Sequence, residues 1–269
     1  MPEITNHGKF EVDPAYDWEQ DLAKEIELAR KFLEKELTEI DHTTDPTMQL
    51  ICMFSLLDSL AQEQANYPRD SKKAFCEFVL KHQKQCDYME CVEPITLYYH
   101  VEDLIEKSAF ISGFPPEPEI SLESLGYLDM QPVKKAILSG KAQEILDYIS
   151  QKIRPEFADK KKREHQLISL IYRMRSKAVH EMSGLGESRC SLQYFTPQEP
   201  YYRDVGRGYV LNGDWVSDDI CELMIPNVFI RNILQDCAAG YLDECREQKR
   251  FPFANNGMTR KHRLSWYDN

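Results

Sequence analysis

The chain lacks long hydrophobic runs. Its longest uninterrupted apolar stretches, such as 51–54, are far shorter than the roughly 20 residues that span a bilayer. The opening residues, Met1-Pro2-Glu3, carry none of the positive charge with which a secretory signal begins. We therefore expect a cytoplasmic protein that makes no membrane contact.

Several common catalytic signatures are absent as well. The 11 glycines form no G-x-x-x-x-G-K loop, and neither G-x-S-x-G nor H-E-x-x-H occurs. These absences exclude the common classes of phosphate-loop protein, hydrolase and zinc protease that carry such motifs. His82, Cys86 and Cys91 are close in sequence, but one C-x4-C without a second pair is not the spacing of a zinc site. We expect no metal and no cofactor.

What the chain does have is the composition of a globular protein. Its 269 residues are 42% hydrophobic, and its charged residues are mixed in sign, which excludes a disordered chain. This length can bury a core without disulfide bonds, so we expect the eight cysteines to be reduced and mostly buried. No period of 20 to 50 residues repeats, which excludes a solenoid.

The net charge of −12 is unevenly distributed. Residues 1–130 hold 27 acidic and 11 basic residues, a net of −16, whereas residues 131–269 hold 18 and 22, a net of +4. Two segments concentrate the positive charge, 160–177 with seven basic residues and 246–263 with six. Each segment fits either a solvated helix face or an anion-binding surface, and the sequence leaves both open.

Hydrophobic periodicity predicts a mainly α-helical protein. Asp45-Pro46 should open a helix whose apolar residues surround nearly its whole circumference, so we expect that helix to be the buried centre. The other expected helices are 13–40, one capped by Asp70, about 94–108, about 132–152, a longer one from Pro155 to about 184, and one that starts at Pro226. Residues 113–131, with several prolines, are expected to form a surface excursion.

Between 190 and 215 the sequence pattern changes from one typical of helices to one typical of β-strands. Tyrosines and valine flank Asn212-Gly213, a strong signal for a tight turn, and predict a small β-hairpin. The chain is therefore expected to be one domain over 1–269. It would comprise a helical core at about 15–184, the hairpin at about 190–215, and a C-terminal helix with a basic tail at about 225–269.

The candidate catalytic side chains are concentrated in residues 170–181, where three cationic side chains and His180 lie within fewer than three turns of one helix. Ser176 and His180 lie on nearly one face, but Arg175 is about 140° away from His180 around the helix and about 7.5 Å away along it. One helix alone therefore brings them together poorly. A long arginine could still reach the same cleft, and a second copy across a two-fold axis would supply another Arg and His opposite.

This segment resembles the signature of HEPN domains, which is an Arg, a polar residue, a short spacer with apolar residues and a His. Arg175-Ser176-Lys177-Ala178-Val179-His180 fits it, and Arg173, with six residues between it and His180, also fits the loose spacing of the family. Arg175 is preferred because polar Ser176 follows it. The resemblance, which is to uncharacterised bacterial HEPN-like proteins, extends loosely over 15–250.

The resemblance implies an HEPN-like helical bundle that cleaves RNA without a metal, in a composite site made by two protomers. In this interpretation His180 is the general base or acid, Arg175 the phosphate clamp and Ser176 an orienting hydroxyl. Arg173 and Lys177 would contact the RNA backbone. The residue types suit the reaction, because a neutral imidazole can accept the proton of a ribose 2′-hydroxyl and a guanidinium can hold the phosphate as negative charge develops.

Asp58 stands alone in an otherwise apolar helix and fits two roles. It could hold one of the site arginines as a supporting residue, or it could be a buried cap or ion pair of purely structural value. The family also contains inactive members that serve as binding modules.

Two functions therefore stay open. The first is a homodimeric, metal-independent endoribonuclease that cleaves RNA in defence or stress response and has a neutralising or activating protein partner. The second is a non-catalytic dimerisation or protein-interaction module. Catalysis would require Arg175 and His180 to line an open, positive cleft, whereas the module needs them only to pair internally.

Overall fold

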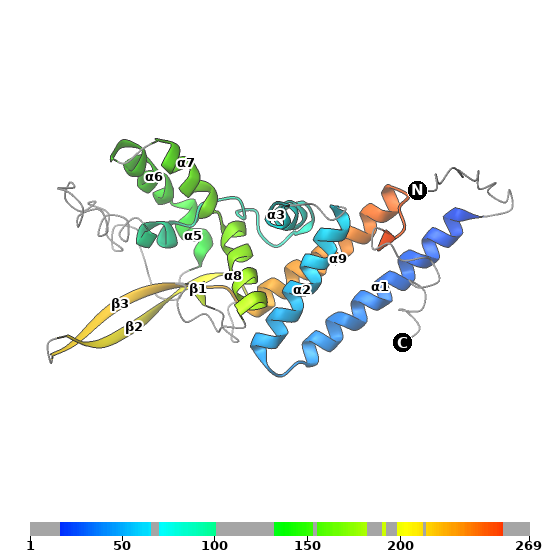
Figure 1. Ribbon diagram of the computed structural model, residues 1–269, viewed down its shortest axis with the longest axis horizontal. Helices are drawn as coiled ribbons and strands as arrows, with labels where there is room; N and C mark the ends of the chain where they lie inside the picture. Colours follow the sequence, from blue (N-terminus) through cyan, green and yellow to red (C-terminus); the bar gives the residue numbers. More distant parts are fainter. Residues whose placement is uncertain are drawn as a thin grey trace, which may run out of the picture.

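The computed structural model describes residues 17–65, 70–100, 132–152, 155–181, 190–191, 198–211 and 214–254. This part of the chain is mainly helical with a small sheet, which confirms the expected class (Figure 1). The helices are α1 (Trp18–His42), α2 (Pro46–Gln64), α3 (Ser71–His82), α5 (Val133–Leu138), α6 (Lys141–Lys152), α7 (Pro155–Glu164), α8 (Leu167–Glu181) and α9 (Asn227–Glu247). Residues 94–100 are also helical.

Aspartates cap the first three helices. Asp17 accepts a hydrogen bond from the Gln20 backbone N–H (3.0 Å), and Asp70 accepts one from that of Lys73 (2.9 Å). Asp45 accepts two, and Pro46 follows it in the first turn, where its missing N–H costs nothing. The expected start of the first helix at residue 13 lies outside the described residues.

The core lies where α9 packs against α1, α2 and α3, and where α8 packs against α2 and α3. Figure 1 shows α1, α2 and α9 at one end of an elongated molecule and α5, α6, α7 and the strands at the other. The prediction that α2 is buried all round is wrong on one side, since Met48 is 45% exposed. Helix α9 has buried residues from its first turn to its last, among which Ile233, Leu234 and Cys237 are fully enclosed.

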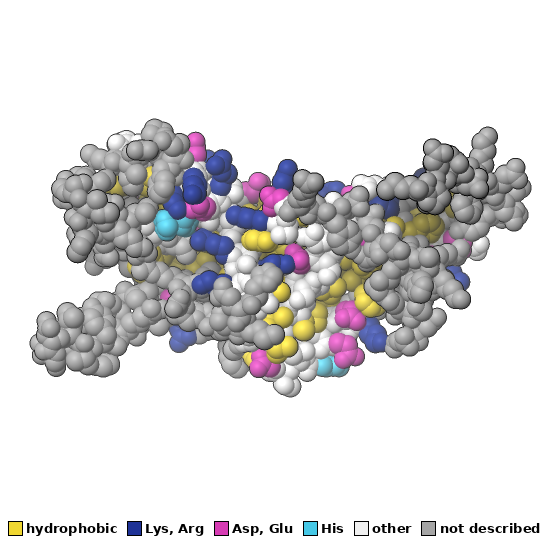
Figure 2. Space-filling view, viewed as in Figure 1, with side chains coloured by type: hydrophobic (Ala, Val, Ile, Leu, Met, Phe, Trp, Pro, Cys, Tyr) yellow, Lys and Arg dark blue, Asp and Glu magenta, His cyan; other side chains and the backbone are white. Residues whose placement is uncertain are grey.

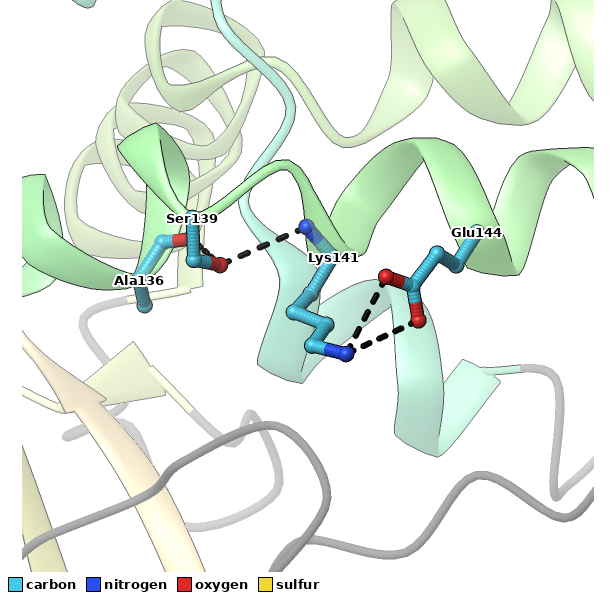
Figure 3. Close-up of polar contacts among 4 residues, drawn as sticks. All are labelled: Ala136, Ser139, Lys141 and Glu144. Atoms are coloured by element: carbon cyan, nitrogen blue, oxygen red, sulfur yellow. Dashed lines mark hydrogen bonds and ion pairs between the residues drawn. The ribbon is translucent and has the colours of Figure 1, made fainter.

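Two helices predicted to be continuous are each broken in two. Gly140, with φ of +79°, turns the chain between α5 and α6, a conformation that favours glycine. Ser139 Oγ donates to the Ala136 carbonyl (2.6 Å) and accepts from the Lys141 N–H (3.3 Å) at this turn (Figure 3). Lys141 Nζ then pairs with Glu144 at 3.0 Å.

The second break separates α7 from α8 at residues 165 and 166. Here the backbone pairs with a distant segment: the Glu93 N–H donates to the His165 carbonyl (2.8 Å), and the Leu167 N–H donates to the Cys91 carbonyl (3.0 Å). These tertiary hydrogen bonds take the place of helical ones, so the single long helix predicted after Pro155 becomes two.

The sheet consists of a long hairpin and one short strand. Strands β2 (Tyr201–Leu211) and β3 (Asp214–Met224) pair antiparallel from Tyr201↔Met224 to Leu211↔Asp214, and β1 (Cys190–Ser191) pairs with β3 in parallel. The hairpin is confirmed, but its second strand runs to Met224 rather than ending near 215. The expected turn residues Asn212-Gly213 lie between the strands and outside the described residues.

Hydrogen bonds to a buried carboxylate anchor the base of the hairpin. Glu93 is fully buried and accepts from the backbone N–H groups of Ile95 and Thr96, both at 2.7 Å. The hydroxyl of Tyr202, at the start of β2, donates to the same carboxylate. The Cys221 N–H donates to the Tyr99 hydroxyl (2.8 Å), so both long strands are fixed to the segment around residues 93–100.

The structure also bears on the expectations for the cysteines, the surface excursion, the basic tail and membrane-spanning helices. Cys86, Cys221, Cys237 and Cys245 are buried and Cys52, Cys76 and Cys91 are half-buried, so the prediction holds for four of the seven cysteines whose side chains are described. The surface excursion at 113–131 and the end of the basic tail lie outside the described residues. In the part of the chain that the structure describes, no helix combines the length and the apolar character that crossing a membrane requires.

Candidate functional site

Helix α8 carries most of the predicted site residues. Its apolar side is buried and packs on α2 and α3. The buried apolar residues are Leu167, Ile168, Leu170, Ile171, Met174 and Ala178. The polar residues of 173–177 therefore fall either at the edge of this packed side or on the side that faces solvent.

Arg175 belongs to the packed side. It is 8% exposed, and its Nη2 lies 2.6 Å from Asp58 Oδ2 on α2. Its guanidinium also lies 5.6 Å from the centre of the Tyr172 ring, a cation–π distance. Asp58 thus holds an arginine, as one interpretation expected, and the residue preferred as phosphate clamp is engaged inside the protein.

Tyr172 ties α8 to α3 beside this ion pair. Its hydroxyl lies 3.1 Å from Ser71 Oγ, and its ring meets Phe75 edge-on with centroids 5.5 Å apart. Together with Arg175, it fixes the rotation of α8 about its own axis. That rotation decides which residues of the helix face solvent.

Arg173 lies on the solvent side. It is exposed, and its Nη2 donates to the Glu164 carbonyl at the end of α7 (3.0 Å), where a cation complements the helix dipole. Ser176 and Lys177 are half-buried. Positions 173, 176, 177 and 180 follow the i, i+3, i+4, i+7 spacing of one helix face.

His180 lies in the last turn of α8, and its side chain is outside the described part of the structure. By backbone position it is only about 20° from Arg173 around the helix. The geometry therefore groups Arg173, Ser176 and Lys177 with the position of His180, and it separates Arg175 from them. We call this set the polar face of α8.

Helix α7 adds positive charge beside the polar face of α8. Lys160, Lys162 and Arg163 are exposed, whereas Lys161 is buried and lies 2.6 Å from Glu164. Figure 2 shows Lys and Arg side chains gathered over α7 and α8. The basic segment 160–177 is thus partly internal and partly a cationic surface open to solvent.

Sequence reasoning missed His165, at the corner between α7 and α8. It is 2% exposed, its Nδ1 lies 2.9 Å from the Lys161 carbonyl, and its ring centroid is 5.2 Å from that of His100. Burial, together with the charges of Arg173 and Lys161, lowers the pKa of His165 to about 4. A neutral ring whose Nδ1–H donates to a carbonyl is a structural group, and no sequence signal marked it.

No metal site emerges from the described residues, where no three His, Cys, Asp or Glu side chains are grouped to hold an ion. His82 lies 2.7 Å from Gln64 Oε1 and 3.2 Å from Glu244 Oε2, so it joins three helices. Burial raises the pKa of the Cys86 thiol to about 11, which disfavours the thiolate that metals bind.

A hollow of about 280 Å³ lies between α2 and α3. Its lining residues are Ala61, Gln64, Ala65, Ala74, Glu77, Phe78 and Lys81. None of these belongs to α8, so this hollow and the polar face of α8 are different places.

Comparisons of the chain with models of protein families, with curated proteins and with solved structures found no match.

Proposed function

We propose that the protein is a metal-independent endoribonuclease of HEPN type and that the polar face of α8 is its site. One observation carries the proposal. Arg173, Ser176 and Lys177 share a solvent-facing helix face with the position of His180, beside the exposed cations of α7. A cationic surface is notable on a chain with a net charge of −12, and it suits a polyanion.

The residue types support a simple reaction. The imidazole of His180 takes the proton of a ribose 2′-hydroxyl, and the 2′-oxygen attacks the adjacent phosphorus. The bond from phosphorus to the 5′-oxygen breaks, and that oxygen leaves with the proton that the imidazole has taken up. The products are a 2′,3′-cyclic phosphate and a 5′-hydroxyl. Arg173 and Lys177 stabilise the negative charge that develops on the phosphate.

This assignment exchanges the roles of the two arginines. Arg173 is exposed and on the face of His180, whereas Arg175 is buried against Asp58. Arg173 therefore becomes the phosphate clamp, and Arg175 holds α8 in place. Since one helix offers few groups to a phosphate, the proposal keeps a second protomer that completes the site.

The test is cleavage of total RNA and of tRNA in EDTA by the wild type, His180→Ala, Arg173→Ala and Arg175→Lys. Loss of a general acid–base group lowers the rate by about 100-fold or more, and loss of a charge-stabilising group by about 100-fold. We expect such losses for His180→Ala and Arg173→Ala. Arg175→Lys keeps a cation near Asp58 and should retain most activity in variants that stay folded.

The ends of the RNA fragments give a second readout. Fragments with cyclic phosphate ends resist a ligase that requires a 3′-hydroxyl, and removal of the cyclic phosphate restores ligation. Equal cleavage by wild type and His180→Ala would overturn the assignment of the site. Absence of cleavage by the wild type would overturn the nuclease itself.

One observation favours a second function, that of a non-catalytic dimerisation or interaction module. Arg175, which fits the family signature best, is paired internally with Asp58 at 2.6 Å. An ion pair of this kind constrains how two helices pack and needs no substrate. A wild type that self-associates but leaves RNA intact is the result expected for the module.

A further inference from the structure

The hollow between α2 and α3 combines an apolar lining with a few polar groups. The apolar part of the lining is Phe78 with three alanines. The polar part consists of Gln64 on α2 and of Glu77 and Lys81 on α3. Figure 1 shows α3 beside the end of α2, and the two helices pack together there. A concave, mostly apolar lining with a small number of polar groups is the ordinary form of a site for a small ligand.

His82 fixes the orientation of the Gln64 amide. Burial lowers the pKa of His82, so its ring is neutral near pH 7 and only one of its nitrogens carries a hydrogen. Its Nε2 lies 2.7 Å from Gln64 Oε1 and 3.2 Å from Glu244 Oε2. Since both neighbours are acceptors, Nε2 is the nitrogen that carries the hydrogen. The Gln64 amide nitrogen therefore faces away from His82, and no described residue accepts a hydrogen bond from it.

Glu244 on α9 also holds the second donor of the hollow. Its Oε2 lies 2.7 Å from Lys81 Nζ as well as 3.2 Å from His82. One buried carboxylate thus positions both donors, the Lys81 ammonium directly and the Gln64 amide through His82. Glu77, one turn before Lys81 on α3, supplies an acceptor, and its ion-pair partner among the described residues is Lys73 at 3.7 Å.

Size and charge define the ligand. The volume of about 280 Å³ lies below the range of about 300 to 1,000 Å³ that is typical of sites for drug-sized ligands, so the ligand has only a few carbon atoms. Lys81, the one cation among the lining residues, is paired with Glu244, and Glu77 stands beside it. The hollow therefore has no excess of positive charge, which disfavours phosphate and other anions. The ligand that fits is neutral overall, with a carboxylate for the donors, an ammonium group for Glu77 and an apolar body.

We propose that the hollow between α2 and α3 binds a free α-amino acid with an aliphatic side chain of about the size of leucine. Its carboxylate accepts hydrogen bonds from the Gln64 amide and from Lys81, and its ammonium group pairs with Glu77. Its side chain lies against Phe78 and the alanines. The proposal does not rest on the proposed nuclease, because none of the lining residues belongs to α8.

The experiment is saturation-transfer NMR with the full chain and L-leucine. The comparison ligands are glycine, 3-methylbutylamine and 4-methylpentanoate, which lack the side chain, the carboxylate and the ammonium group of leucine, respectively. A ligand this small binds in the millimolar range. We expect the wild type to bind leucine in that range and to bind each comparison ligand at least about three-fold more weakly, since an exposed ion pair contributes up to about five-fold in affinity.

Two substitutions at exposed positions test the place of binding. Ala65 lines the hollow, so the ring introduced by Ala65→Phe should fill it and abolish leucine binding. Glu77→Gln should weaken leucine binding about three- to five-fold and leave the binding of 4-methylpentanoate unchanged. Glu144→Gln is the matched control and should bind as the wild type does. Like Glu77, Glu144 on α6 is an exposed helical glutamate that pairs with a lysine one turn before it.

Circular dichroism and thermal unfolding establish that each variant is folded. Absence of saturation transfer to leucine in the wild type would overturn the proposal, and so would leucine binding that persists in Ala65→Phe. Glycine or 4-methylpentanoate bound as tightly as leucine would also overturn it, as would equal losses in Glu77→Gln and Glu144→Gln. RNA cleavage by the same proteins bears on the nuclease alone, so the two proposals fail separately.

Discussion

At the scale of single residues, the ion pair between Arg175 and Asp58 decides the role of the arginine. Both side chains are largely enclosed, with 9% and 19% of their surfaces exposed. Removal of one partner leaves the other charge in a poorly solvated place, which costs far more than the pair itself contributes. The pair is therefore better understood as a constraint on how α8 sits against α2 than as a source of net stability.

We predict that Asp58→Ala lowers the free energy of unfolding by about 2 to 4 kcal/mol, because Arg175 loses its carboxylate inside the protein. Arg173→Ala, at an exposed position of the same helix, should lower it by less than about 1 kcal/mol. Urea unfolding followed by circular dichroism measures both. A loss in Asp58→Ala no larger than that in Arg173→Ala would show that the pair is solvated and that Arg175 is available to a ligand.

At the scale of secondary-structure elements, a glycine permits the contact between α9 and α3. A Cβ at Gly240 would lie 2.4 Å from His82 Nδ1 and 2.9 Å from His82 Cγ. The ring cannot move away easily, since it is 8% exposed and lies within hydrogen-bonding distance of Gln64 and Glu244. Gly240 is thus required by the close approach of the two helices rather than by its own backbone.

We predict that Gly240→Ala lowers the free energy of unfolding by about 1 to 3 kcal/mol through overpacking. In a His82→Ala background the clashing ring is gone and only the Cβ of residue 82, at 3.0 Å, stays close, so the same change should cost less, helped by the preference of alanine for a helix. Urea unfolding of the four proteins gives the coupling between the two positions. Equal losses in both backgrounds would mean that another neighbour resists the methyl group.

Some boundaries of the helices and strands could be predicted from the sequence and others could not. Caps at Asp45 and Asp70 and the start of α9 after Pro226 were predicted correctly, because capping and periodicity are local. The length of β3 was not predicted. Asp218, Asp219 and Glu222 interrupt the alternation of apolar and polar residues by which a strand is recognised in a sequence. Its extent is set by the strand it pairs with, which is information from elsewhere in the chain.

At the scale of the whole molecule, buried histidines couple stability to pH. Burial lowers the pKa of His165 to about 4 and also lowers that of His82, against the attraction of Glu244. Between an ordinary pKa near 6.5 and the lower folded value, the unfolded chain binds a proton that the folded chain does not. The free energy of unfolding therefore falls as pH decreases through this range, by at most about 1.4 kcal/mol per pH unit for each histidine.

We predict that the wild type loses stability between about pH 7 and about pH 5, and that His165→Asn loses less over the same interval. Asparagine keeps an N–H donor for the Lys161 carbonyl but does not titrate. Urea unfolding at the two pH values measures the difference. The same pH dependence in both proteins would show that His165 is protonated in the folded state or that other groups carry the effect.

The sequence by itself determined the mainly helical class, the hairpin, most helix starts and the cationic, histidine-bearing segment of α8, because these depend on local periodicity, capping and composition. Only the tertiary structure decided that the helix after Pro155 breaks at His165, where backbone groups bond to residues 89–93. It also decided that α2 leaves one side to solvent, and that Arg175 turns inward to Asp58 while Arg173 turns outward. Two cations two positions apart on a helix point in different directions, and which of them meets the solvent depends on what the helix packs against.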